Sequence, residues 1–154
     1  MHRPLEQRRP ARRQLIRRKG VESMTDEAEI RQAVEEFVVA YNAGNLDGMT
    51  NIFADDLVDM SAGDPTRTGE AAKRQFLSRV SKTHSNFNPT LTIHIDELRV
   101  AGEWAFQRGS LSVSLVPKGG GPISFIKQRY LEIWRRNLQG KWKIAIEMDN
   151  SNEV

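Results

Sequence analysis

Tyr130, Glu132 and Trp134 alternate along one expected strand, so an acid lies between two large aromatic rings on the same face. If that face lines a cavity, burial disfavours the carboxylate and raises the affinity of Glu132 for its proton. A neutral carboxyl can donate a hydrogen bond to a ligand carbonyl. The face could equally be exposed or lie in a contact between two chains, because alternation does not identify the concave side of a sheet.

Asp59 is the second candidate acid. Asp55 and Asp56 lie where a helix is expected to pass into a strand, and capping or solvation explains them there. Asp59 lies within the expected strand and lacks that explanation. A buried Glu132 as acid and a better solvated Asp59 as base could move a proton between them and a ligand. This chemistry requires no metal and no nucleotide, so we expect no cofactor.

Large side chains from several elements are candidates for ligand binding. Aromatic residues of this kind mostly form a core, and a subset is expected to face a small apolar molecule beside the two acids. The residues assigned to this set are Phe37, Tyr41, Phe53, Met60, Trp104, Tyr130 and Trp134.

Other chemistries are disfavoured by composition and spacing. The chain has no cysteine, which excludes a disulfide scaffold, a thiolate zinc site and a cysteine nucleophile. Its three histidines show no ligand-like spacing, and we expect no metal site. The glycines at 119–121 lie between two expected strands rather than before a helix, which indicates a hairpin tip and not a phosphate cradle.

The N-terminal half of the domain has helical periodicity. Thr25 or Asp26 can cap a first helix, with Glu29 placed to complete a capping box from Asp26, and Gly44 ends it. A short second helix is expected over 45–53. The third helix follows Gly69. The expected buried positions are Ile30, Val34, Phe37, Val38 and Tyr41, then Leu46, Met49, Ile52 and Phe53, then Ala72, Phe76, Leu77 and Val80.

From residue 91 onward the period changes to two, which is typical of half-buried strands. Long strands are expected around 91–95, 103–116, 123–136 and 141–148, after a short one at 57–60. Strands of this length must twist and bend, which gives the sheet a concave face. The sequence predicts an α+β fold in which a curved antiparallel sheet wraps around three helices to form a cone with an internal pocket.

The positive charge is concentrated at the N-terminus. Residues 1–23 contain eight Lys or Arg and two Glu, whereas the remainder carries 15 basic and 18 acidic residues. We expect 1–23 to be a disordered basic extension and 24–151 a single domain. The alternatives are a basic arm that binds nucleic acid or an anionic membrane, and an organellar targeting segment. No apolar segment reaches signal-peptide or membrane-helix length, so a cytoplasmic protein without nucleic-acid or membrane partners is expected.

Two sets of motifs carry a family resemblance. Ala43-Gly-Asn-Leu-Asp-Gly48, Phe53-Ala-Asp-Asp56 and Gly69 resemble ketosteroid isomerases over residues 30–77. The second set resembles SnoaL-like proteins of the SgcJ/EcaC type: Trp104-Ala-Phe-Gln-Arg-Gly109, Pro117-Lys-Gly-Gly-Gly121, Tyr130-Leu-Glu-Ile-Trp134, Gly140-Lys-Trp-Lys-Ile144 and Asp149-Asn-Ser151. Both belong to the nuclear transport factor two-like superfamily, and the resemblance implies its cone-shaped fold and homodimers.

The resemblance carries over only part of the isomerase site. Ketosteroid isomerases use a catalytic aspartate, an oxyanion tyrosine and a second, protonated acid. Met60 stands at the position of the aspartate, with Asp59 one residue earlier, and Phe37 stands at that of the tyrosine. Glu132 stands at that of the second acid. One of the three functional positions is thus conservatively filled, one is displaced and one is lost, which argues against true steroid isomerisation.

Two classes of function therefore remain. The domain is either a cofactor-free acid/base enzyme, such as an isomerase, cyclase or dehydratase acting on an apolar or polycyclic carbonyl compound, or a noncatalytic module for ligand binding or dimerisation. A carboxyl within hydrogen-bond reach of a bound carbonyl favours the first, and a cavity filled by its own aromatic rings favours the second.

Overall fold

The computed structural model describes residues 24–152, which form three helices and six strands. The expectation that 1–23 is a disordered extension lies outside the described residues. The helices are α1 Asp26–Asn42, α2 Leu46–Thr50 and α3 Gly69–Asn86. The strands are β1 Phe53–Met60, β2 Arg67–Thr68, β3 Phe87–Ala101, β4 Trp104–Pro117, β5 Ser124–Arg136 and β6 Trp142–Ser151.

Helix α1 begins at a threonine cap. The Thr25 side chain accepts a hydrogen bond from the backbone N–H of Ala28, which satisfies one of the free donors of the first turn. The capping box expected from Asp26 does not form. The Asp26 carboxylate instead accepts from Arg136 and from Trp142 Nε1, and Arg136 also pairs with Glu29. The start of α1 is thereby tied to the far end of β5 and to β6.

The first strand starts earlier than the sequence pattern predicts. Phe53, expected on the second helix, opens β1, so that the strand is eight residues long. Helix α2 ends at Thr50 after little more than one turn, and its single buried residue is Met49, which is fully buried.

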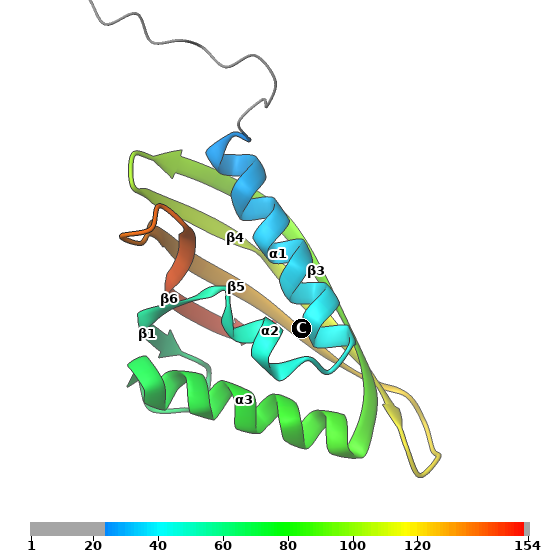
Figure 1. Ribbon diagram of the computed structural model, residues 1–154. Helices are drawn as coiled ribbons and strands as arrows, with labels where there is room; N and C mark the ends of the chain where they lie inside the picture. The colour runs from blue at the N-terminus through cyan, green and yellow to red at the C-terminus, as the bar shows by residue number, and fades with distance from the viewer. Residues whose placement is uncertain (1–23, 153–154) are drawn as a thin grey trace, which may run out of the picture.

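The six strands form one mixed sheet in the order β2-β1-β6-β5-β4-β3. Strands β3 to β6 pair antiparallel, as expected, but β1 pairs parallel to β6. The wholly antiparallel prediction is wrong at this pair, because the crossover from β1 through α3 and the β3–β5 meander returns β6 in the direction of β1. Figure 1 shows the α+β cone, with all three helices on the concave side of the bent sheet.

Two irregularities in the ladders help the sheet to bend. The register shifts between Ile95 and Glu97 on β3, and between Ile133 and Trp134 on β5. Each leaves one strand with an extra residue, Asp96 on β3 and Ala145 on β6, and such bulges increase local twist and bending. The curvature creates the concave face on which the helices pack.

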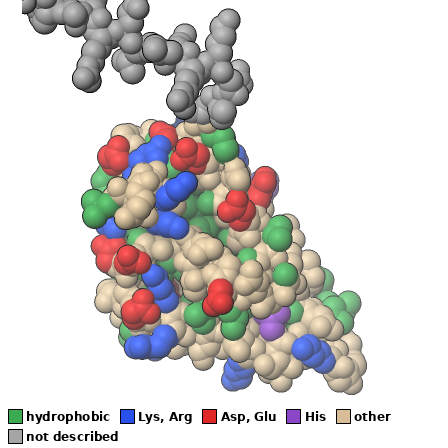
Figure 2. All heavy atoms as spheres, in the orientation of Figure 1, with side chains coloured by type: hydrophobic (Ala, Val, Ile, Leu, Met, Phe, Trp, Pro, Cys, Tyr) green, Lys and Arg blue, Asp and Glu red, His purple; other side chains and the backbone are tan. Residues whose placement is uncertain are grey.

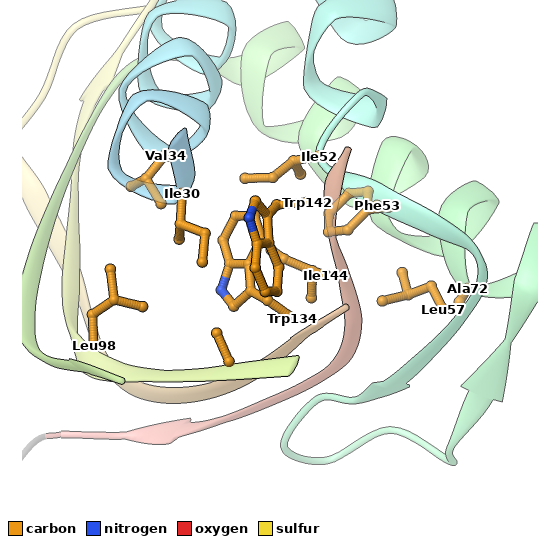
Figure 3. Packing of buried hydrophobic residues seen from close by; sticks show 11 residues of the cluster. Ile30, Val34, Ile52, Phe53, Leu57, Ala72, Leu98, Trp134, Trp142 and Ile144 are labelled. Atoms are coloured by element: carbon orange, nitrogen blue, oxygen red, sulfur yellow. The ribbon is translucent and has the colours of Figure 1, made fainter. Parts of the chain in front are cut away.

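The core divides into two clusters under the helices. The larger one joins α1, β1, β5 and β6, and the indoles of Trp134 and Trp142 occupy its centre (Figure 3). The smaller one, which includes Tyr41, Met49 and Val80, lies nearer to the C-terminal ends of α1 and α3. Among the helices of residues 24–152, none has the length and apolar character needed to span a bilayer.

Candidate active site

A cavity of about 270 Å³ lies between the helices and the concave face of the sheet. Its walls are mainly apolar and aromatic, and its polar side chains are concentrated on the sheet. The apolar and aromatic lining comprises Val34, Phe37, Tyr41, Ile52, Phe53, Phe76, Val80, Leu91, Ile93, Leu111, Val113, Ile126, Tyr130 and Ile144. The polar lining comprises Arg79, Thr83, Gln107, Gln128, Glu132, Glu147 and Asp149.

A row of polar residues crosses four neighbouring strands at the same level. Asp59 on β1 is the register partner of Glu147 on β6, which is the partner of Glu132 on β5, which is the partner of Gln107 on β4. Directly paired residues project to the same side of a sheet, with Cβ atoms about 5 Å apart. Three acids and an amide are therefore placed side by side on the concave face.

Glu132 holds a carboxyl that is largely removed from water. Burial, and then the neighbouring carboxylate of Glu147, raise the pKa of Glu132 well above its ordinary value. The nearby indole N–H of Trp134 lowers the pKa of Glu132 by a smaller amount, although it is too poorly placed to form a hydrogen bond with the carboxyl. Within residues 24–152 the buried Glu132 Oε2 has no hydrogen-bond partner, so no hydrogen bond to this oxygen favours the charged form.

Glu147 is the second acid of the cavity. Burial raises its pKa to about 8, with further contributions from Asp59 and Asp149 and a smaller opposing one from Arg79. A carboxyl with a pKa near the working pH can both take and return a proton, which is the property of an effective general base. The two carboxyls are coupled, because the charge on Glu147 raises the pKa of Glu132.

Asp59 does not line the cavity. It is 4% exposed and accepts hydrogen bonds from the backbone N–H and Oγ of Ser61, at 2.9 and 2.6 Å. Arg79 lies 3.5 Å from its other oxygen. These contacts occupy the carboxylate that we expected to act as a solvated base, and they hold the turn after β1 against α3. Asp59 acts on the cavity through its charge beside Glu147.

Gln107 and Tyr130 form a buried polar pair next to Glu132. Gln107 is 1% exposed, and its Nε2 donates to Tyr130 Oη at 2.9 Å. The tyrosine hydroxyl in turn lies 3.4 Å from the backbone carbonyl of His94. Burial raises the pKa of the Tyr130 hydroxyl, so it remains protonated.

Four of the expected ligand-binding residues lie in the cavity wall, namely Phe37, Tyr41, Phe53 and Tyr130. The rings of Phe37, Phe53 and Phe76 pack against each other with centroids 5.1–6.3 Å apart and form the helical side of the wall. Burial raises the pKa of Tyr41. Trp134 is fully buried and belongs to the core beside the cavity, so it supports Glu132 rather than lining the cavity.

Met60 and Trp104 lie on the convex face, contrary to our expectation that they contact a ligand. Met60 pairs with Met148, one position beyond the inward-facing Asp59. Trp104 is 46% exposed beneath the guanidinium of Arg135, 5.5 Å from the ring centroid, whereas the next residue, Ala105, is buried. Successive side chains of a strand point to opposite faces of the sheet, and Met60 and Trp104 each neighbour a residue that points inward, so both point outward.

The sequence analysis missed Glu147 and Gln107. Glu147 lies three residues after the inward-facing Ile144, which contradicts simple alternation, because the bulge at Ala145 inserts one residue. Gln107 carried a usable signal: it occurs two residues after Ala105 and two before Gly109, on the buried face of β4. Residues 24–152 bring together no group of His, Asp and Glu side chains able to hold a metal ion.

The fold and its cavity define the nuclear transport factor two-like class of cones. Residues 34–144 match the model of the SnoaL-like domain, and the chain belongs to this family. The isomerase-like and SnoaL-like resemblance of the motifs is thus confirmed at the level of the superfamily.

Solved structures agree on the fold. A conserved protein from Planctomyces limnophilus matches with a TM-score of 0.72 and 20% identity, over 82% of this chain and 97% of that one. A ketosteroid isomerase-like protein from Erwinia carotovora atroseptica matches with a TM-score of 0.68 and 20% identity, over 85% and 100%. ActVI-ORFA from Streptomyces coelicolor matches with a TM-score of 0.69 and 13% identity, over 83% and 98%.

Proposed function

We propose that this SnoaL-like domain binds a small, largely apolar carbonyl compound in the cone and moves a proton on it, as in isomerisation or cyclisation. The supporting observation is the cross-strand pair Glu132–Glu147, two acids that line one mainly apolar cavity. The pKa of each acid is raised, chiefly by burial. Acids with perturbed pKa values in one cavity are characteristic of acid/base sites.

Each acid has a distinct role in this reaction. Glu147, once ionised, removes a proton from the carbon next to the carbonyl and later returns it to the same or another carbon. The ligand oxygen takes a proton from solvent as the enol forms, and the enol hydroxyl then donates a hydrogen bond to Glu132. This proton returns to solvent when the carbonyl forms again. The apolar walls orient the ring system. The proposed reaction consumes no cofactor.

The test uses 2-tetralone, an apolar bicyclic ketone with exchangeable protons beside its carbonyl. Proton NMR in D2O follows the loss of these signals above the buffer rate. We expect catalysed exchange that increases as the pH rises through about 8, because the base form of Glu147 accumulates. Glu147→Gln should lose about 100-fold or more of the rate, the usual contribution of a general base. Glu70→Gln, an exposed carboxyl on α3, is the control.

The second candidate function is a noncatalytic binding module. It is favoured by the packed phenyl rings of Phe37, Phe53 and Phe76, which fill the helical side of the cone. The cavity volume of about 270 Å³ lies just below the roughly 300–1,000 Å³ that ligand sites usually measure. Saturable binding of 2-tetralone without exchange above the buffer rate at any pH from 6 to 9 would select this function over the first.

A further inference from the structure

Three buried atoms without hydrogen-bond partners lie in or directly beside the polar floor of the cavity. They are Gln107 Oε1, Glu132 Oε2 and Trp134 Nε1. Leaving a buried polar group unpaired costs about 1–3 kcal/mol, so three neighbouring examples require an explanation. Gln107 and Glu132 are register partners, and the Trp134 indole lies close enough to influence the Glu132 carboxyl.

The orientation of the Gln107 amide follows from its contacts. Tyr130 Oη has the His94 carbonyl as acceptor for its proton, so the hydroxyl oxygen receives the Gln107 Nε2 donor. This arrangement directs Gln107 Oε1 away from Tyr130. Oε1 is therefore a buried acceptor on the strand next to Glu132, and Tyr130 cannot satisfy it.

We propose that the acid proton of Glu132 lies on Oε2 and is donated to Gln107 Oε1, which makes Gln107 the positioning residue for this carboxyl. The count of donors supports the assignment. The indole supplies one N–H for two unpaired acceptor oxygens, and the acid proton supplies the missing second donor.

This assignment defines the ligand group that Glu132 selects, and that part rests on the proposed function. With its proton held by Gln107, Glu132 presents Oε1 to the cavity, since only Oε2 is among the buried atoms. Oε1 is then a carbonyl-type acceptor. The ligand should therefore present a donor, such as the hydroxyl of an enol or phenol, so that the enol form of a carbonyl compound is bound in preference to the ketone.

The first experiment needs no ligand. The side-chain carboxyl of Glu132 is titrated by carbon-13 NMR in a Glu147→Gln background, so that a single cavity glutamate titrates while Asp59, Asp149 and Arg79 stay unchanged. Gln107→Met keeps the side-chain length and removes the acceptor of the acid proton. Loss of a bond to the neutral form should lower the pKa of Glu132 by about one unit.

Leu111→Val is the matched control, because it changes the lining of the same cavity from the same strand and neither removes nor adds a polar atom. It should leave the Glu132 titration unchanged. Gln107→Leu is the second variant in case methionine does not fold. An unchanged or increased pKa in a folded Gln107 variant would overturn the positioning role, since a residue that only fills space gives no decrease.

The second experiment compares 2-naphthol with 2-methoxynaphthalene by calorimetry. The two share a ring system, but only the naphthol donates a hydrogen bond. We expect about tenfold tighter binding of the naphthol, the factor that one satisfied buried hydrogen bond supplies, and loss of this preference in Gln107→Met. Equal affinities would contradict the donor selection. If neither compound binds, the ligand-binding function fails, while the titration still decides the role of Gln107.

Discussion

At the scale of single residues, the acids of the concave face differ in what surrounds them. Asp59 accepts hydrogen bonds from Ser61 and lies beside Arg79, whereas Glu147 and Glu132 face an apolar cavity with fewer polar partners. The pKa of each glutamate is raised first of all by burial. Arg79, a cation next to the row, also pairs with Asp64 at 3.2 Å.

This arrangement predicts that stability falls between about pH 5 and pH 8. The native protein holds a proton on Glu147 up to about pH 8, while the unfolded chain releases it near pH 4.5. Because the native state binds more protons in this interval, raising the pH favours unfolding, by up to about 1.4 kcal/mol per pH unit for one such group. Urea unfolding at pH 5.5 and 8 measures the slope.

Glu147→Gln should reduce that slope and stabilise the protein at pH 8, whereas the exposed Glu70→Gln should leave it unchanged. The lowered pKa values of Asp56 and Glu97 have the opposite sign, and they act only at more acidic pH. Stability that is constant or increases with pH over this interval would show that Glu147 is ionised in the native state at neutral pH.

At the scale of elements, the close packing of β4 between β3 and β5 requires a glycine at position 109. A Cβ at Gly109 would clash with the His94 carbonyl and lie 2.7 Å from Tyr130 Oη. Gly109→Ala must therefore separate β3 from β4 or displace the tyrosine that anchors Gln107. We expect a loss of about 1–3 kcal/mol in the free energy of unfolding, typical of overpacking.

Gly119→Ala is the matched control for this prediction. Gly119 lies in the β4–β5 hairpin, where a Cβ would meet nothing within 4 Å, and the change should stay within about 0.5 kcal/mol. Denaturant melts of the two variants measure the difference. Equal stabilities would mean that the strands can separate at Gly109 without loss.

Much of this element plan could be predicted from the sequence, because the helices and long strands have strong periodicity. Gly44 and Gly69, both with positive φ, were recognised as boundaries of α1 and α3. The parallel pairing of β1 with β6 could not be predicted, since the two strands are far apart along the chain and alternation carries no information on direction. Of the two caps predicted for α1, Thr25 is the one observed, and the capping box from Asp26 does not form because Asp26 is bound instead by Arg136 of β5.

A site residue could be predicted from the sequence only where the face of the helix or strand that it occupies could be predicted. Glu132, Tyr130, Phe37 and Tyr41 lie in the cavity wall because each belongs to a regular stretch of its element, whereas Phe53 lies there although it opens β1 instead of ending the second helix. Glu147 follows a bulge, which reverses the expected side and has no sequence signal of its own. Met60 and Trp104 were assigned by size, but size does not determine which side of a strand a residue occupies.

At the scale of the whole molecule, charges are mixed on the face shown in Figure 2. Acidic and basic side chains alternate there instead of forming a patch of one sign. Binding to a nucleic-acid backbone usually requires an extended basic surface, which this face does not offer. The convex side of the sheet carries no helix (Figure 1), so its outward-facing side chains are not covered by the rest of the chain that the structure describes.

We predict that this convex face forms a homodimer. Met60, Met148 and Leu131 are register partners across β1, β6 and β5, and Leu131 and Met148 are 42% and 43% exposed. An apolar row along a sheet needs cover, and two copies can supply it by burying roughly 1,600 Å² in total. Light scattering at micromolar concentration should report a dimer, and Leu131→Asp a monomer with an unchanged fold. Val39→Asp, at an exposed position of α1, should remain dimeric; a monomeric wild-type protein or a dimeric Leu131→Asp variant would exclude this interface.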